Sequence, residues 1–471
     1  MEHTMKNVSF AALEAQLALW EAPGSPGGQI LVRHHGETVY ERCAGLACLE
    51  LSAPIVPETR FNIASNSKQF TVMAILMLME EGKLRLDDDV RRYLPDLVAF
   101  DEPLTLHQCM TNTGGVRDVL ELLVMSGRRA DDTMTRDDVA RMLARQTGLN
   151  FAPGSRYLYS NSHFFYLVEI VERVSGMRYP DFARTRIFEP LHMHDTVVQS
   201  GYAALIPHRA TSYHDDGTRF LNHVFNCGYY GDGNIWSTAR DLAAFAAHHE
   251  KPFLIRPETA ALMQTPPVLT GGGETDYACA LRVGSLDGHR YLCHGGADAS
   301  FRSQFLCFPE DELEVVVLTN TVNLSPDALA EAAARCALGL PDAPQSASLP
   351  GDPAFDPADA PGLYVLDTPD GAMTFAASGR GEALSLRDDY GPAPLTPLGG
   401  GCFRLGRRPL TLRLGAAPAV WMGGNAVPLT KYAPQPLPER RYARYEGVYE
   451  SAELGTRYAV VLRGGCALLV R

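Results

Sequence analysis

Two residues three positions apart, Ser65 and Lys68, are the clearest candidates for catalysis in this sequence. They form the pattern Ser-x-x-Lys at the start of an apolar stretch that we expect to be helical, so both side chains lie on one face, a turn apart. A helix N-terminus, together with burial, disfavours a second positive charge there. Both effects favour the neutral amine that a lysine needs in order to activate a serine. The pattern predicts nucleophilic catalysis by Ser65.

Tyr159 and Asn161 form a second candidate pair, Tyr-x-Asn. They follow a Pro-Gly turn and precede a helix that we expect over 162–174. Tyr159 could share a proton with the Ser65 and Lys68 pair, and Asn161 could donate a hydrogen bond to a substrate carbonyl. The alternative interpretation is a core tyrosine beside a serine that caps a helix.

A third candidate is the run His294-Gly295-Gly296, which follows a predicted strand and leads into Ala297. Glycines at a strand edge let a substrate backbone approach closely. The backbone N–H of Ala297 could then join that of Ser65 in an oxyanion hole. A surface turn with a solvated histidine is the alternative.

The elements around these residues predict a two-lobed α/β unit. The expected elements are a helix over 9–21, strands near 30–32 and 39–40, a buried helix over 65–81, a mainly helical region to about 250, a hairpin of 303–308 and 313–318, and a helix over 325–338. The strands lie at both ends of this region and the helices in the middle. One sheet and one helical lobe would therefore enclose a groove that holds the site.

The C-terminal third has a different composition. Residues 343–361 are rich in proline and predict a linker, and short alternating runs with many glycines follow. Gly362-Leu363-Tyr364 is repeated as Gly447-Val448-Tyr449, which suggests two related small β-domains, the second one partial. We expect a catalytic domain over 1–342, a small β-barrel domain over 362–433 and a partial second β-domain over 434–471. The last segment either packs as an added hairpin or is truncated relative to its relatives.

Composition excludes several classes of protein. The 471 residues are 46% hydrophobic and carry a formal charge of −13, which argues against a nucleic-acid partner. No apolar run reaches membrane-spanning length, and we expect no export signal and no membrane association. The ten cysteines show no zinc spacing, so we expect free thiols in a cytoplasmic protein that needs no metal or other cofactor.

The order of the three candidate groups resembles the serine β-lactamase and penicillin-binding-protein superfamily, and its class C branch in particular. Thr111–Gly115 and Trp236–Leu242 resemble two further segments of that superfamily. The resemblance covers residues 10–340. It implies an antiparallel sheet flanked by helices, an all-helical lobe, and hydrolysis through an acyl-enzyme on Ser65.

Within that branch, His294-x-Gly296 in place of Lys-Thr-Gly is similar to the D-aminopeptidases, as are Gln69-Phe70-Thr71 and Val116-Arg117-Asp118. The resemblance implies Ser65 as nucleophile, Lys68 and Tyr159 as the proton-transfer pair, and His294 on the strand that lines the substrate. Substrate-binding roles fall on Asn161, Gly296 and Ala297. It also implies C-terminal β-barrels.

In those relatives, a loop from the barrel region enters the active site and recognises the amino group of the substrate. Here the second copy is cut short, so we expect only weak selectivity for a free α-amine.

Other functions remain open at this stage. The same site could serve an esterase or a weak β-lactamase, and a non-catalytic relative could bind peptides or penicillin-like ligands. The expected partners are a small-molecule or short-peptide substrate and a second copy of the chain in a homodimer.

Overall fold

The computed structural model describes most of the chain. The described residues are 9–129, 131–216, 218–341, 351–352, 354–368, 371–380, 383–388, 391–405, 411–415, 417–422, 425–432, 443–463 and 466–470. Of the linker expected over 343–361, residues 343–350 and 353 lie outside them. No helix of the described part is long and apolar enough to cross a membrane.

The central element is a six-stranded antiparallel sheet in the order β12-β13-β14-β15-β1-β2. Its strands are β12 (Arg282–Leu286), β13 (His289–Asp298), β14 (Phe301–Phe308), β15 (Leu313–Thr319), β1 (Gly28–His34) and β2 (Glu37–Ala44). Because β1 pairs with β15, the two ends of the catalytic region meet in one sheet, as the sequence predicted.

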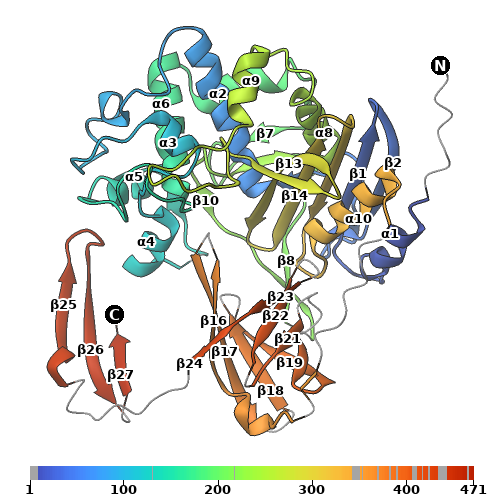
Figure 1. Ribbon diagram of the computed structural model, residues 1–471, viewed down its shortest axis with the longest axis vertical. Coiled ribbons are helices and arrows are strands. Elements are labelled where there is room, and N and C mark those ends of the chain that lie inside the picture. The colour runs from blue at the N-terminus through green and yellow to red at the C-terminus, as the bar shows by residue number, and fades with distance from the viewer. Residues whose placement is uncertain are drawn as a thin grey trace.

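Alternating residues of β1 pack into two different cores. Ile30 and Val32 face a cluster formed with α1 (Ala11–Gln16), η1 (Leu17–Leu19) and α10 (Pro326–Leu338). Leu31 faces the larger core on the other side, where α8 (Ala239–His248) packs against the sheet. The strand is therefore apolar on both faces because helices cover both faces of the sheet. Figure 1 shows α10 and α1 together beside β1.

The helical lobe is built around α2 (Lys68–Glu80) and α6 (Asn161–Ser175). The side chains of α2 from Lys68 to Leu78 are all buried, which explains its apolar sequence all round the helix. Its other helices are α3 (Leu106–Met110), α4 (Val119–Ser126), α5 (Arg136–Leu143), α7 (Tyr179–Ala183) and α9 (Pro257–Met263), with short turns η3 (Val90–Arg92) and η4 (Arg184–Phe188).

Short strands connect the two lobes. They are β3 (Leu46–Cys48), β4 (Ala53–Pro54), β5 (Phe61–Asn62), β6 (Met134–Thr135), β7 (Val197–Val198), β8 (Tyr213–Asp215), β9 (Phe220–Asn222), β10 (Cys227–Gly228) and β11 (Ile235–Ser237). The pairing of β5 with β11 is the one that matters for the site, because β5 leads directly to Ser65.

The C-terminal region contains two further antiparallel sheets, drawn below the catalytic unit in Figure 1. The first contains β16 (Gly362–Thr368), β17 (Gly371–Arg380), β18 (Ala383–Asp388), β19 (Gly391–Gly399), β20 (Cys402–Leu405), β21 (Thr411–Arg413), β22 (Ala419–Met422), β23 (Asn425–Pro428) and β24 (Thr430–Tyr432). Its strand order stays open over the described residues. An antiparallel sheet with its own apolar core is therefore present, but the expected barrel is not seen to close.

The predicted repeat is visible in local geometry. A short 3₁₀ turn, η5 (Pro357–Asp359) or η6 (Ala443–Tyr445), precedes each glycine, and Gly362 and Gly447 have φ of +154° and +158°. The Tyr364 hydroxyl donates to the Ala360 carbonyl at 2.6 Å, and the Tyr449 hydroxyl donates to the Tyr445 carbonyl at 2.7 Å. Tyr364 is fully buried whereas Tyr449 is 48% exposed, so only the first copy encloses this tyrosine in a core.

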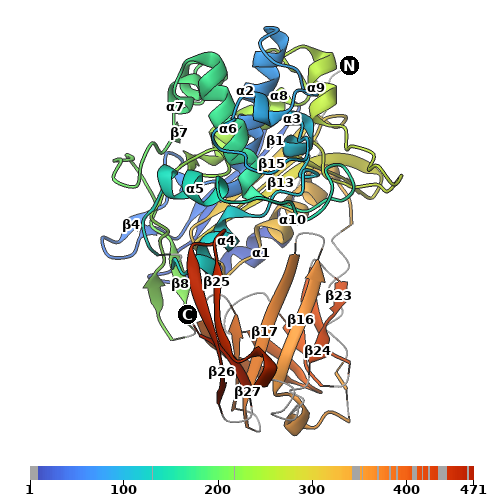
Figure 2. The ribbon, with the colours of Figure 1, turned by 90° about the vertical axis from the view of Figure 1, so that its left-hand side faces the viewer.

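The second sheet, β25 (Gly447–Ser451), β26 (Thr456–Arg463) and β27 (Cys466–Val470), contacts the helical lobe beside α4. Figures 1 and 2 both show this sheet below α4. The Glu453 carboxylate pairs with Arg117 at 2.8 Å and accepts from the Thr147 N–H at 3.0 Å. Leu454 is buried in the core of the lobe. These contacts attach the turn between β25 and β26 to the helical lobe.

We predict that Gly28→Ala destabilises the catalytic unit by about 1–3 kcal/mol, because the added carbon would lie 2.2 Å from the Leu318 carbonyl and 2.7 Å from the Trp20 ring. Thermal unfolding monitored by circular dichroism would measure the loss. Gly201→Ala is the matched control, because nothing lies within 4 Å of its added carbon. Equal melting temperatures for the two variants would contradict this packing.

Candidate active site

Ser65 lies in a 3₁₀ turn, η2 (Ala64–Ser67), directly before α2. The predicted helix over 65–81 therefore starts three residues later than expected, at Lys68. Ala64 has φ of +50°, a conformation that an alanine rarely adopts. This sharp turn separates Ser65 from the regular helix and lets its side chain line the cavity between the lobes.

The Lys68 ammonium group donates hydrogen bonds to three oxygens. Its Nζ lies 2.9 Å from Ser65 Oγ, 2.8 Å from Asn161 Oδ1 and 2.7 Å from the Asp232 carbonyl. Three acceptors match the three protons of an ammonium group. If the amine is neutral, its lone pair can instead accept the proton of the Ser65 hydroxyl with no movement of heavy atoms.

Burial lowers the pKa of Lys68 to about 8, although the charges of Asp232 and Asp118 act in the opposite direction. The side chain is fully buried, and its Nζ lies 5.0 Å from the centre of the Tyr159 ring. A pKa this close to neutrality is what a general base for Ser65 requires. This agrees in direction with the expectation from the sequence, and burial is the main cause.

Asn161 is held in one orientation by Asp118, a residue whose part in the site the sequence did not indicate. The Asp118 carboxylate accepts from the Asn161 backbone N–H at 2.6 Å and from its Nδ2 at 2.9 Å. Its other oxygen caps α4 by accepting from the Leu120 N–H at 2.9 Å. Since Nδ2 faces Asp118, Oδ1 faces Lys68, and the second proton of Nδ2 is left to reach a substrate.

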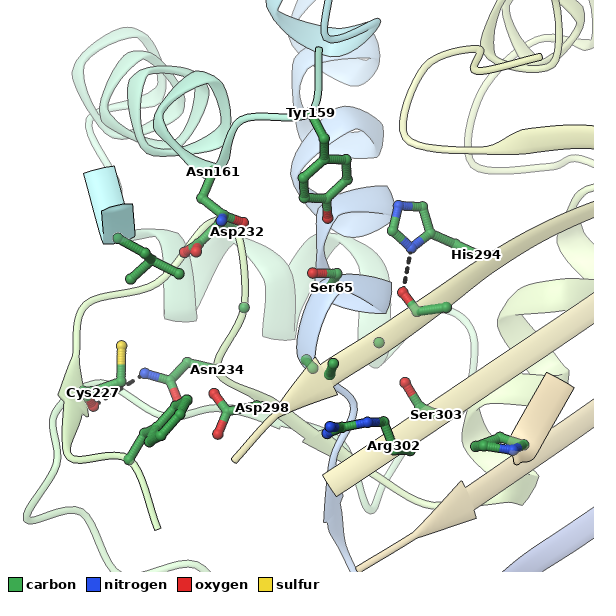
Figure 3. A pocket seen from close by; sticks show the side chains of 18 of the residues that line it. Ser65, Tyr159, Asn161, Cys227, Asp232, Asn234, His294, Asp298, Arg302 and Ser303 are labelled. Carbon is green, nitrogen blue, oxygen red and sulfur yellow. Dashed lines mark hydrogen bonds between the residues drawn. The ribbon is translucent and has the colours of Figure 1, made fainter. Parts of the chain in front are cut away.

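Tyr159 and His294 lie on the side of Ser65 away from Asp232, and Figure 3 shows the Tyr159 hydroxyl directed toward Ser65. His294 Nδ1 lies 2.6 Å from the Gly295 carbonyl, and its Nε2 lies 3.0 Å from the Tyr277 hydroxyl. A carbonyl can only accept, so Nδ1 carries the proton and Nε2 accepts from Tyr277. Burial, and then the charge of Lys68, lowers the pKa of His294 to about 3, so the ring is neutral.

Gly296 allows β13 to approach the turn that carries Ser65. A side chain at this position would lie 2.2 Å from Ser303 Oγ and 2.3 Å from the Ile63 carbonyl. Ser303 also holds the strands against the turn that carries Ser65. Its hydroxyl donates to the Ile63 carbonyl at 2.7 Å and accepts from Asn66 Nδ2 at 2.7 Å. The close approach brings Ala297 to the wall of the cavity that Ser65 also lines.

A cavity of about 500 Å³ joins these groups. Six of the seven predicted site residues line it: Ser65, Tyr159, Asn161, His294, Gly296 and Ala297. The seventh, Lys68, lies behind them and is hydrogen-bonded to Ser65. The cavity is also lined by four charged residues that the sequence analysis did not single out: Asp232, Asp298, Asp327 and Arg302. No group of three or more potential metal ligands occurs in the described part of the chain.

The two-lobed fold and a serine bonded to a buried lysine define a class of protein built for nucleophilic catalysis. The beta-lactamase family model matches residues 12–338, and the chain belongs to that family. It is similar to the D-aminopeptidase of Brucella canis, with 30% identity over 351 residues that cover 72% of this chain. The match spans 65% of the length of that relative.

Solved structures share the fold. The octameric penicillin-binding protein homologue from Pyrococcus abyssi aligns with a TM-score of 0.63 and 24% identity, covering 89% of this chain and 99% of that one. The D-amino acid amidase from Ochrobactrum anthropi SV3 aligns with a TM-score of 0.54 and 20% identity, covering 66% of this chain and 92% of that one.

We predict that kcat/KM rises with pH through a midpoint near 8, because the pKa of Lys68 is about 8 and its neutral form accepts the Ser65 proton. The substrate should be an uncharged ester, so that only the enzyme titrates. Asp118→Asn removes a charge that raises the pKa of Lys68, so the midpoint should move to lower pH. A flat profile between pH 6 and 10 would rule out this role for Lys68.

We also predict that Gly296→Ala lowers kcat/KM by roughly 10²-fold, because the added carbon pushes β13 away from the Ser65 turn. Gly295→Ala is the control, since its added carbon meets only the end of the Gln304 side chain, at 3.1 Å. Steady-state kinetics on one ester substrate would compare the two variants. Equal losses would show that the close approach of Gly296 is not what positions the strand.

Proposed function

We propose that this protein is a serine hydrolase that cleaves amide bonds, in the manner of a D-aminopeptidase, through an acyl-enzyme on Ser65. The observation that carries the proposal is the contact between the Ser65 hydroxyl and the buried amine of Lys68, at 2.9 Å. Membership of the beta-lactamase family and similarity to a D-aminopeptidase support it. The substrates are amides or short peptides of D-amino acids.

In the first step, Ser65 Oγ attacks the substrate carbonyl carbon and its proton passes to the Lys68 and Tyr159 pair. Negative charge develops on the carbonyl oxygen, which the backbone N–H groups of Ser65 and Ala297 stabilise. The same pair returns the proton to the leaving amine as the carbon–nitrogen bond breaks. Asn161, oriented by Asp118, donates its remaining Nδ2 proton to a carbonyl on the acyl part.

In the second step, the Lys68 and Tyr159 pair takes a proton from a water molecule, whose oxygen attacks the acyl carbon. The bond between that carbon and Ser65 Oγ then breaks, Oγ regains the proton, and the acyl group leaves as a carboxylic acid. His294 takes no proton in either step, because its ring is neutral and both nitrogens have partners. We therefore assign His294 to the wall of the site. A weak β-lactamase is less well supported, because the similar proteins named above include a D-aminopeptidase and a D-amino acid amidase.

An esterase on the same site remains the second candidate, because the chemistry on Ser65 is the same for both bonds and esters have the better leaving group. The measurement that separates them is the ratio of kcat/KM for an amide and an ester with the same acyl group.

We further propose that residues 1–342 form the catalytic domain, 362–433 a small β-barrel-like domain and 434–471 a partial second one. The protein is expected to act in the cytoplasm, and the free thiols of its described cysteines support a reducing compartment. A homodimer is the expected assembly, which light scattering after size exclusion would measure.

We predict that Ser65→Ala abolishes turnover, with a loss of roughly 10³-fold or more in kcat, and abolishes labelling by a fluorophosphonate. Intact mass spectrometry would count the adduct, and peptide mapping would locate it. Ser303→Ala is the control for labelling, because Ser303 also lines the cavity but its hydroxyl is bonded to Ile63 and Asn66. Turnover by Ser65→Ala near the wild-type rate would refute the proposed function.

A further inference from the structure

The cavity has two sides that differ in charge. Figure 3 shows Asp232 and Asp298 on one side of Ser65 and the neutral His294 on the other. The proposed reaction uses only the backbone carbonyl of Asp232, which accepts from Lys68 at 2.7 Å, and it uses no part of Asp298. Both carboxylates nevertheless line the space that a substrate must occupy.

Asp298 is placed by the strand that forms the oxyanion site. Side chains alternate along a strand, so Asp298 shares a face of β13 with Gly296, two residues earlier. Gly296 packs directly against Ile63 and Ala64, the residues just before Ser65. One step along the strand, roughly 7 Å, therefore brings the Asp298 side chain beside the acyl part of a substrate bound to Ser65.

The charge of Asp298 is not neutralised by the protein. Its carboxylate accepts no hydrogen bond and forms no ion pair among the described residues. Arg302 lies near it, but the Arg302 guanidinium donates to the Ala299 and Phe301 carbonyls at 2.9 and 2.6 Å. The Asp232 carboxylate has one long contact, from the Tyr229 hydroxyl at 3.4 Å. The amine of Lys68 already has three acceptors.

The two carboxylates also act on each other. Burial, and then the charge of Asp232, raises the pKa of Asp298 to about 7. The pKa of Asp232 is likewise raised by burial. A cation bound beside the two carboxylates would offset both the cost of burying them and their mutual repulsion. A primary ammonium group has three N–H donors with which to bind them. The charge of Arg302, which also lines the cavity, offsets the raised pKa of Asp298 only in part.

We propose that Asp298, with Asp232 next to it, binds the free ammonium group on the acyl part of the substrate. The inference rests on the proposed hydrolase function and narrows its substrates to amides and peptides with an unblocked amino group. It differs from the weak amine selectivity expected in the sequence analysis, because here the catalytic domain itself supplies the acidic group.

The test is a comparison of alanine amide with N-acetylalanine amide, in both stereochemical series, at pH 7.5. We expect the wild-type enzyme to favour the free amine by about a hundredfold in kcat/KM. Asp298→Asn should reduce that preference by tenfold or more, through a slower reaction of the free amine, while the rate on the N-acetyl amide is retained. The retained rate shows that the variant is folded.

Asp327→Asn is the matched control, because Asp327 lines the rim of the same cavity at the start of α10 and the change removes the same charge. It should keep the wild-type preference. Asp298→Glu, which restores the charge, should recover part of what Asp298→Asn loses. Equal reduction by Asp298→Asn and Asp327→Asn would mean that only overall charge matters, and would overturn the proposal.

Failure of this inference can be told apart from failure of the proposed function. If both amides are hydrolysed at similar rates and Asp298→Asn changes neither, the ammonium site is wrong and the hydrolase stands. If no amide or ester is hydrolysed and Ser65 takes no fluorophosphonate, the proposed function itself is wrong.

Discussion

The geometry of the site depends on one buried charge. An ammonium group out of contact with water is costly unless each of its protons has an acceptor. Lys68 meets this requirement with oxygens from three segments: the Ser65 turn directly before it, the first residue of α6 and the loop before β11. The last two lie 93 and 164 residues away in the sequence. The same requirement fixes the position of the nucleophile.

The partners of Lys68 are themselves held by residues with no direct part in the chemistry. Asp118 fixes the Asn161 amide while capping α4, so one carboxylate sets both the start of a helix and the orientation of a site residue. On the other lobe, Ser303 joins β14 to the Ser65 turn. Neutral His294 then leaves the acidic side of the cavity as its main charged surface.

The sequence predicted those features that depend on short spacing. Ser65 and Lys68 are three residues apart and meet across one turn, and the alternation along 30–32 correctly indicated a strand of the main sheet. The hairpin of β14 and β15 and the α10 helix also followed from local pattern. The start of α2 was misplaced because nothing in the sequence indicates that Ala64 has a positive φ.

The parts of the site that were missed depend on long-range contacts. Asp118 reaches Asn161 across 43 residues, and the Asp232 carbonyl reaches Lys68 across 164. The run Val116-Arg117-Asp118 was noted only as a family resemblance, and nothing in it shows that the Asp118 carboxylate contacts Asn161. A backbone carbonyl carries no residue-type signal at all. Asp298 lies four residues after His294, just beyond the predicted His294-Gly295-Gly296 run. Only the packing of β13 shows that Asp298 faces the cavity.

The docking of the C-terminal hairpin bears on the order in which the molecule is assembled. Arg117, next to Asp118, pairs with Glu453 across 336 residues. Contacts that close such long loops form late, since much of the chain must be ordered before they can be made. During synthesis from the N-terminus, the nucleophile, its lysine and most of both lobes would emerge long before Glu453 does. The helical lobe would therefore exist for a time with the Arg117 side of its surface uncovered, a stage at which a chaperone or a protease would find it more accessible than the finished protein.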